Sequence, residues 1–252
     1  MMLKGKNAII TGARTGIGLA CLRLFAENGC NCWAVVHRQT DDFRALCEEL
    51  SSRCDVRIET VVMELASSEE IREGMKHILR SEGGVDILVN AAGAVSPSRL
   101  FTMTPLRGMK QVMDVNFFAP MELAQLASRS MLRKKSGCIV NIASVSADGS
   151  DGAQLEYAAS KAALICATRK LAMELGPSGI RVNAVSPGLT DTKMLASFSL
   201  EALEQITRNT GLQRKGTPEE IANVCLFLCS EQSSFINGET IRVDGGSMRN
   251  AQ

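Results

Sequence analysis

The sequence predicts an α/β fold in which a mostly parallel, seven-stranded sheet is doubly wound, with helices on both faces. Short, continuous apolar runs alternate with longer amphipathic stretches through all 252 residues. Such runs are typical of strands buried on both faces of a parallel sheet, and the stretches between them are typical of crossover helices. A glycine-rich turn directly follows the first run, as it does in folds that wind right-handedly around a parallel sheet.

The elements follow from this alternation in chain order. The predicted strands are the apolar runs at residues 7–11, 31–37, 56–63, 85–90, 138–143, 181–186 and 239–243. The predicted helices are the amphipathic stretches at residues 16–28, 41–53, 68–81, 105–133, 154–175 and 217–229. No linker, repeat or low-complexity segment interrupts them, which predicts a single domain over residues 1–252. Only residues 188–216 break the alternation, and this length is typical of a functional or partly helical segment, here expected to be a substrate lid.

The composition excludes several classes of partner. There are 28 Lys and Arg against 27 Asp and Glu, so the formal charge is +1, whereas nucleic-acid binding needs a net basic face. No stretch approaches the ~18 apolar residues of a membrane span, and we expect a cytoplasmic protein without a signal peptide. Nine cysteines without CxxC spacing, and histidines only at 37 and 77, predict reduced thiols and no metal site.

The turn after the first predicted strand is spaced like a phosphate-binding loop. Gly12, Gly16 and Gly18 form the pattern G-x-x-x-G-x-G, which is neither the general dinucleotide fingerprint nor a P-loop. Gly12 allows a sharp turn, Gly16 lets the backbone approach a ligand, and Gly18 lets the helix pack close to the sheet. Because the helix that begins here offers free N–H groups, we expect a nucleotide phosphate to bind; a purely structural turn is the alternative.

Tyr157 and Lys161 are four residues apart on a predicted helix, so their side chains share one face. A phenol has a pKa of about 10, and a neighbouring ammonium lowers that pKa by stabilising the phenolate. Ser144 follows the predicted strand 138–143 at the carboxyl edge of the sheet, where its hydroxyl can meet a substrate carbonyl. These residues predict an acid–base site; a surface tyrosine beside a solvated lysine is the alternative.

Three further positions lie near the same edge. Residues 90–93 end the fourth strand, and their small side chains let a ligand lie against the backbone. Asn116 falls inside the long predicted helix 105–133, where Asn is a mediocre helix former, so it marks a functional side chain, a local kink or a tolerated residue. Pro187 and Gly188 end the sixth strand. Each of these is an ordinary feature if taken alone.

Taken together, these residues resemble the short-chain dehydrogenase/reductase family, which has a Rossmann-type fold. The match covers nearly the whole chain in order, and its most specific part is Ser144, thirteen residues before Tyr157, with Lys161 four residues later. Within the family, the sequence most resembles 3-oxoacyl-[acyl-carrier-protein] reductases. The segments that carry this resemblance are 180–188, 218–222, 237–239 and 243–246.

The resemblance implies a role for each catalytic residue. Tyr157 would be the general acid for carbonyl reduction and the base for alcohol oxidation, and Lys161 would lower its pKa and hold the nicotinamide ribose. Ser144 would polarise the substrate carbonyl, and Asn116 would hold a water that links Lys161 to solvent. The cofactor-binding residues implied are Gly12, Arg14, Thr15, Gly16, Ile17, Gly18, His37, Arg38, Glu64, Leu65, Asn90, Ala91, Ala92, Gly93, Tyr157, Lys161, Pro187, Gly188, Thr190 and Thr192.

Some positions depart from the family pattern. Glu64 and Leu65 stand where an Asp-Val pair is usual, and Ala91 stands in place of a second Asn. Thr190 replaces an aliphatic residue, while Thr192 is kept.

The charge after the second strand bears on the choice of cofactor. NAD-specific members have an acidic residue there for the ribose hydroxyls, whereas this chain has His37 and Arg38 and no acid before Asp41. Arg38, together with Arg14, is expected to clamp a 2′-phosphate. This favours NADP(H) over NAD(H), although both residues are also compatible with an ordinary loop.

We therefore expect an NADP(H)-dependent oxidoreductase that interconverts a ketone and a secondary alcohol. A 3-oxoacyl thioester is the preferred substrate, with an acyl carrier protein as a candidate partner through Lys134 and Lys135; Met173 replaces a usual basic contact. A sugar or other small ketone is the alternative substrate.

Other classes remain as alternatives to the enzyme. The complete Ser-Tyr-Lys set opposes a non-catalytic nucleotide sensor, and a Ser-His-Asp hydrolase lacks a suitable histidine. The resemblance also implies a homotetramer, with helices 105–133 and 154–175 pairing across a two-fold axis.

Overall fold

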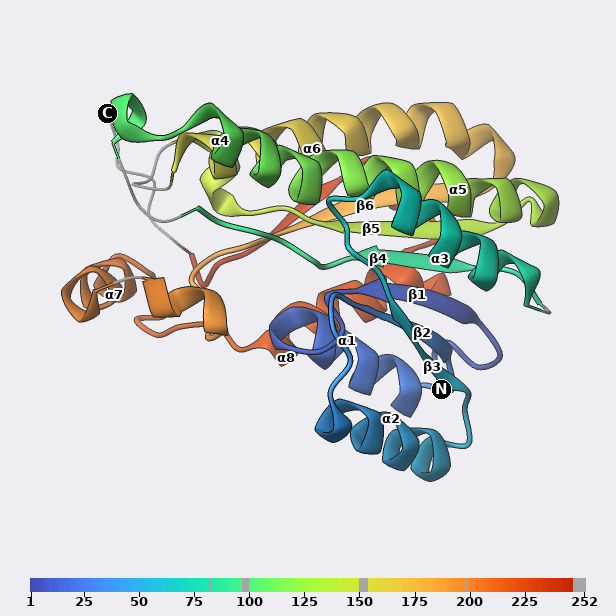
Figure 1. Ribbon diagram of the computed structural model, residues 1–252. Coiled ribbons are helices and arrows are strands. Elements are labelled where there is room, and N and C mark those ends of the chain that lie inside the picture. Colours follow the sequence, from blue (N-terminus) through green and yellow to red (C-terminus); the bar gives the residue numbers. More distant parts are fainter. Residues whose placement is uncertain (82, 97–99, 150–153, 198, 247–252) are drawn as a thin grey trace.

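A computed structural model describes every residue except 82, 97–99, 150–153, 198 and 247–252. Its centre is a seven-stranded sheet of order β3-β2-β1-β4-β5-β6-β7, in which every neighbouring pair is parallel (Figure 1). This confirms the predicted fold class and all seven predicted strands, whose ends shift by at most two residues. The strands are β1 (Asn7–Thr11), β2 (Asn31–Val36), β3 (Ile58–Val62), β4 (Ile87–Asn90), β5 (Gly137–Ile142), β6 (Ile180–Pro187) and β7 (Thr240–Val243).

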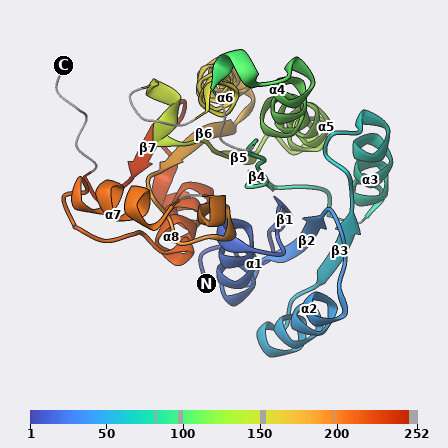
Figure 2. The same cartoon turned by 60° about the vertical axis from the view of Figure 1, so that its left-hand side comes forward.

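Helices cover both faces of the sheet, as Figure 2 shows. On one face lie α1 (Gly16–Glu27), α2 (Asp41–Cys54) and α8 (Pro218–Cys229). On the other lie α3 (Ser68–Arg80), α4 (Leu106–Met113), α5 (Ala119–Lys134) and α6 (Leu155–Leu175). Successive residues of a strand point to opposite faces of the sheet, so each strand contributes side chains to two separate hydrophobic cores. Thus Ala8 and Ile10 of β1 pack toward α1 and α8, whereas Ile9 packs toward α3 and α5.

The core on the side of α1 and α8 is rich in thiols. Seven of the nine cysteines are buried there, while Cys54 is half-buried and Cys166 on α6 is exposed. All nine are free thiols. The buried ones are Cys21, Cys30, Cys32, Cys47, Cys138, Cys225 and Cys229.

The long helical region predicted over residues 105–133 is confirmed, because the backbone is helical without a break from Leu106 to Lys134. A π-helical turn at Asp114–Phe118 divides this region into α4 and α5, which is the local irregularity that Asn116 was expected to mark as one of its alternatives. Pro120 supplies the physical reason, because it has no N–H to donate to the carbonyl of Asn116 and its ring would crowd that carbonyl in a continuous α-helix. The wider turn places Asn116 in the interior, where its side chain is fully buried.

The long segment 188–216 is partly helical. It contains a short 3-10 helix at Lys193–Ser197 and helix α7 at Leu200–Arg208, which no predicted helix covered. Its two ends are joined, because Asp191 N–H donates to the carbonyl of Gly216 and Gly216 N–H donates to the carbonyl of Leu189. The segment therefore leaves the sheet after β6 and returns to almost the same place before α8.

The strand order reverses between β1 and β4. The chain steps outward from β1 to β3 and then crosses back to β4. Loops that follow two such strands diverge to opposite faces and leave a crevice at their carboxyl ends, where α/β proteins bind ligands. Within the described part of the chain, no helix is long and apolar enough to cross a membrane.

Candidate active site

The glycine-rich loop lies at this strand reversal, between β1 and α1. Gly12 and Gly16 have φ of +66° and +55°, which glycine adopts without strain. A Cβ on Gly18 would clash with the carbonyl of Gly12. The first turn of α1 has no side-chain cap from Thr15, whereas Thr40 and Ser67 cap α2 and α3. Uncapped N–H groups at a helix start are those that bind phosphate.

The glycine loop is tied to the loop after β4. The hydroxyl oxygen of Thr11 accepts the N–H groups of Ala91 and Ala92 at 2.9 and 3.0 Å. A Cβ on Gly12 would lie 3.0 Å from Cα of Ala92, so the two backbones are in close contact. The structure thus brings together two of the predicted cofactor-binding segments, 12–18 and 90–93.

The ends of β2 and β3 bring together two more predicted residues. His37 Nδ1 lies 2.9 Å from a carboxylate oxygen of Glu64, and Arg38 follows on the exposed turn. Leu65 is half-buried and packs against the core on the α3 side. The predicted cationic group is therefore at the surface beside an acidic side chain.

Tyr157 and Lys161 lie on successive turns of α6. The Lys161 ammonium is 5.8 Å from the centroid of the Tyr157 ring, and it donates to the carbonyl of Ile142 at 2.8 Å. Only 3% of Lys161 is exposed. Burial disfavours the charged form and lowers the pKa of Lys161 to about 8.

Ser144 directly follows β5 and is almost buried. Its hydroxyl donates to Ser146 Oγ, and its oxygen accepts the Ser146 N–H, both at 3.2 Å. A cavity of about 340 Å³ opens beside it, between α6 and β7.

Asn116 connects the exit of β4 with α6. Its Oδ1 accepts the N–H of Ala94 at 2.7 Å, and its Nδ2 donates to the Ala94 carbonyl and to Ser160 Oγ at 2.9 and 3.0 Å. A Cβ on Gly93 would lie 3.6 Å from both Asn116 Oδ1 and Lys161 Nζ. Asn116 and Lys161 therefore face the same glycine, and the water relay between them stays a prediction.

The segment after β6 approaches the glycine loop from the other side. Gly188, after Pro187, packs against Asp244 so closely that a Cβ would come within 2.7 Å of it. Thr190 donates to the Gly188 carbonyl at 3.0 Å. The methyl group of Thr192 lies 3.2 Å from the Cβ position of Gly16. Thr192 is thus at the loop where a nucleotide is expected.

Sequence reasoning missed a hydrogen-bonded pair beside this set, of which one member is buried and the other half-buried. Ser96, after the exit of β4, donates to a carboxylate oxygen of Glu156 at 2.5 Å, and Glu156 is 4% exposed. The two residues are 60 positions apart, so no local pattern announces them. The sequence shows only an acidic residue directly before Tyr157, and its burial becomes visible only in the folded chain.

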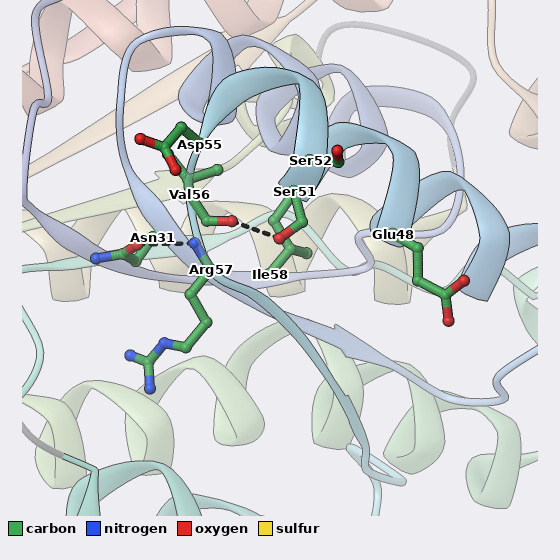
Figure 3. A pocket seen from close by; sticks show the side chains of 8 residues that line it. All are labelled: Asn31, Glu48, Ser51, Ser52, Asp55, Val56, Arg57 and Ile58. Carbon is green, nitrogen blue, oxygen red and sulfur yellow. Dashed lines mark hydrogen bonds between the residues drawn. The ribbon is translucent and has the colours of Figure 1, made fainter.

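A cavity of about 620 Å³ lies elsewhere and contains none of the predicted site residues. Figure 3 shows it at the amino ends of β2 and β3, where Ser51 donates to the carbonyl of Val56 and Arg57 N–H donates to Asn31 Oδ1. Among the residues that the structure describes, no group of three or more His, Cys, Asp and Glu side chains could hold a metal ion.

Comparisons with known proteins agree with this geometry. A family model described as enoyl-(acyl carrier protein) reductase matches residues 12–248. A 3-oxoacyl-[acyl-carrier-protein] reductase of Aquifex aeolicus is 38% identical over 97% of this chain and 98% of its own length.

Solved structures extend the likeness to the fold. A short-chain type dehydrogenase/reductase from Mycobacterium marinum is 31% identical with a TM-score of 0.90, covering 98% of this chain and 96% of that one. L-sorbose reductase from Gluconobacter frateurii, complexed with NADPH and L-sorbose, is 30% identical with a TM-score of 0.90. The match covers 99% of this chain and 100% of that one. With a family model over most of its length and relatives of this identity along nearly all of it, the chain belongs to the short-chain dehydrogenase/reductase family of oxidoreductases.

Proposed function

We propose that this chain is an NADP(H)-dependent reductase that converts a ketone to a secondary alcohol, or catalyses the reverse reaction. The observation that carries the proposal is the buried Lys161 ammonium beside the Tyr157 ring. A cation at this place stabilises a phenolate, so Tyr157 can release its proton near neutral pH. Among short-chain dehydrogenases/reductases this is the chemistry expected of an acid–base tyrosine.

The backbone of the glycine-rich loop and of the start of α1 suits the binding of a dinucleotide. The glycines at 12, 16 and 18 form a surface without side chains, and the uncapped start of α1 offers N–H groups to the pyrophosphate. Segment 90–93 and Thr192 border the same loop. When bound, the reduced cofactor supplies the hydride, and the protein supplies position and charge.

NADP(H) is preferred to NAD(H) because the turn after β2 is cationic. Arg38 is exposed beyond β2, and Arg14 is half-buried in the adjacent glycine loop. Guanidinium groups bind phosphate through paired hydrogen bonds. The NADPH bound to the similar L-sorbose reductase supports the same preference.

Three side chains would handle the substrate carbonyl. The Tyr157 hydroxyl would donate its proton to the developing alkoxide, while Lys161 holds the resulting phenolate charge. Ser144 would turn its hydroxyl from Ser146 to the substrate oxygen and stabilise the charge there. Asn116 keeps the exit of β4 in place beside them.

A 3-oxoacyl thioester is the preferred substrate because apolar side chains surround the carboxyl end of the sheet. Leu100 and Phe101 are 72% and 65% exposed just before α4, and Leu200 is 80% exposed on α7. Figure 1 places the start of α4 and α7 at this same end of the sheet. Such side chains suit an acyl chain, and the similar reductase of Aquifex aeolicus bears the name of that activity.

A small polar ketone such as a sugar is the second candidate. The similarity to L-sorbose reductase favours it, and so does the exposed Met173 on α6, since a basic residue there would suit an acidic carrier protein. Lys134 is already paired with Asp86 at 2.6 Å, which leaves Lys135 as the other predicted carrier contact.

The test is Tyr157→Phe together with cofactor binding. We expect a loss of at least about 10²-fold in kcat with 3-oxoacyl thioesters, since general acid catalysis contributes roughly 10²–10⁴-fold. NADPH at about 100 times its Kd should still raise the Tm of both proteins by about 5–10 °C, from about 2.7 kcal/mol of linkage. A wild type that binds NADPH but reduces no ketone would favour the nucleotide sensor, and a Tm shift with NADH alone would refute the cofactor preference.

Residues 188–216 are proposed to be a substrate lid on the single domain 1–252. The joined ends of the segment and the contact of Thr192 with the glycine loop support this. The cytoplasmic location stays a prediction of the sequence.

A further inference from the structure

Glu156 is a buried carboxylate for which the proposed chemistry has no use. It lies in the first turn of α6, directly before Tyr157, and is 4% exposed. Burying a carboxylate is costly unless hydrogen bonds and favourable dipoles compensate for lost water. The start of α6 supplies the dipole, and Ser96 supplies a hydroxyl donor at 2.5 Å. Because these two interactions compensate for burial, Glu156 can serve to hold Ser96 in place.

Its partner belongs to a short strap that leaves β4. The strap is residues 94–96, and two buried side chains hold it. The Asn116 side chain pairs with both backbone groups of Ala94, and Glu156 accepts the hydroxyl of Ser96. The first anchor comes from the π-helical turn and the second from α6, so the strap bridges the two helices beside the catalytic set.

The strap is separate from the cofactor segments next to it. Ala91 and Ala92 are held by the hydroxyl oxygen of Thr11, which belongs to β1. Loss of the Ser96 anchor would leave those hydrogen bonds intact. The chain beyond the strap includes Leu100 and Phe101, the exposed apolar side chains assigned to the substrate. Displacement of the strap should therefore affect the carbonyl substrate and spare the cofactor.

We propose that Glu156 is a positioning residue for the carbonyl substrate: through its hydrogen bond with Ser96 it fixes strap 94–96 against the first turn of α6 and so sets the wall of the substrate site beside Tyr157. The inference rests on the proposed ketone reduction. It concerns the hydrogen bond rather than the charge of Glu156, since an amide oxygen can accept the same hydroxyl.

The first arm of the experiment needs no substrate. Hydrogen exchange of peptides that cover residues 91–96 is compared in the wild type, Ser96→Ala, Glu156→Ala and Glu156→Gln. We expect the Ala94 amide to exchange about threefold to tenfold faster in both alanine variants, roughly the effect of one lost hydrogen bond. Glu156→Gln should stay within twofold of the wild type. Glu174→Ala is the matched control, because Glu174 is exposed on the same helix.

The second arm separates positioning from general destabilisation. Ser96→Ala and Glu156→Ala should raise the KM for a 3-oxoacyl thioester about threefold to tenfold, with kcat and the KM for NADPH within twofold. The double variant should be no worse than either single variant, because both remove one interaction. Glu156→Gln should restore the KM, and Ser96→Ala keeps the test open if Glu156→Ala does not fold.

The exchange rates and the KM values together decide between the possible roles of Glu156. Unchanged exchange in both alanine variants overturns the anchoring, whatever the activity. Faster exchange with an unchanged KM for the thioester overturns the substrate role. The same holds if Glu156→Gln raises that KM as much as Glu156→Ala does. A wild type without ketone reduction refutes the proposed function instead, and the exchange arm then decides the anchoring alone.

Discussion

At the scale of single residues, the buried ammonium of Lys161 lowers the free energy of unfolding. Its pKa of about 8, against an ordinary value of 10.5, corresponds to about 3 kcal/mol of destabilisation of the fold below pH 8. As the pH rises from about 8 to 10.5, the folded state carries neutral lysine while the unfolded state is still protonated. The free energy of unfolding should therefore rise across this window.

Lys161→Met tests the cost of burying this charge. At pH 7 the variant should be more stable by about 1–2 kcal/mol, once the lost hydrogen bond to Ile142 is subtracted, which raises Tm by about 2–8 °C. The gain should shrink toward pH 10.5, and turnover should be lost. Thermal unfolding measured at both pH values checks it, and a variant that is less stable at pH 7 would contradict the assigned cost of burial.

Arg38 gives a second test at this scale. Arg38→Ala should raise the KM for NADPH about tenfold to 100-fold and leave the KM for NADH within twofold, because only NADPH carries the 2′-phosphate. Arg23→Ala on the exposed face of α1 is the matched control. Steady-state kinetics with both cofactors decide, and equal effects on the two would show that Arg38 does not select the phosphate.

At the scale of elements, an ion pair joins the end of segment 188–216 to α8. Arg214 donates to both carboxylate oxygens of Glu220, which also accepts the Thr217 N–H in a capping box. Arg214 first, and that N–H second, lower the pKa of Glu220 to about 2. Its contribution to stability is therefore present above the ordinary carboxyl pKa of 4.5 and is lost as the pH falls from there to about 2.

Arg214→Ala should loosen the lid while sparing the core. We expect the pKa of Glu220 to return toward 4.5 and protease cleavage within residues 188–216 to accelerate at pH 7.5, with Tm shifted by less than about 2 °C because the pair is exposed. Carboxyl NMR titration and timed proteolysis give the two readouts. Cleavage at the wild-type rate would mean that the Thr190–Gly216 pairing suffices to hold the segment.

At the scale of the whole molecule, we expect a homotetramer. Helices α5 and α6 would pair with those of a second copy, which would cover Leu132 and Met173, both exposed here. Sedimentation at micromolar concentration should give four chains. Met173→Glu should then weaken assembly, whereas Val62→Glu, at an exposed site on the edge strand β3, should not. A compact monomer would contradict the expectation.

How far the sequence predicts this molecule depends on how local each cause is. Strands and helices follow from apolar periodicity within ten or twenty residues, so all seven strands could be placed. The long helix over residues 105–133 also follows from periodicity, whereas its π-helical turn at Asp114–Phe118 depends on Pro120 and on contacts of Asn116 with Ala94, 22 residues away. The proximity of Asn116 and Lys161 to Gly93 follows from family spacing, whereas the Ser96–Glu156 bond requires the folded chain.

The thiol-rich core gives the protein a built-in reporter of its own unfolding. Reagents that alkylate thiols reach Cys166 in the chain as described, whereas the seven thiols packed between the sheet and the layer of helices α1, α2 and α8 are buried. Their labelling must wait for the layer to open. Counting alkylated cysteines by mass against time would thus measure the opening rates of wild-type and variant chains without denaturant and without an engineered label.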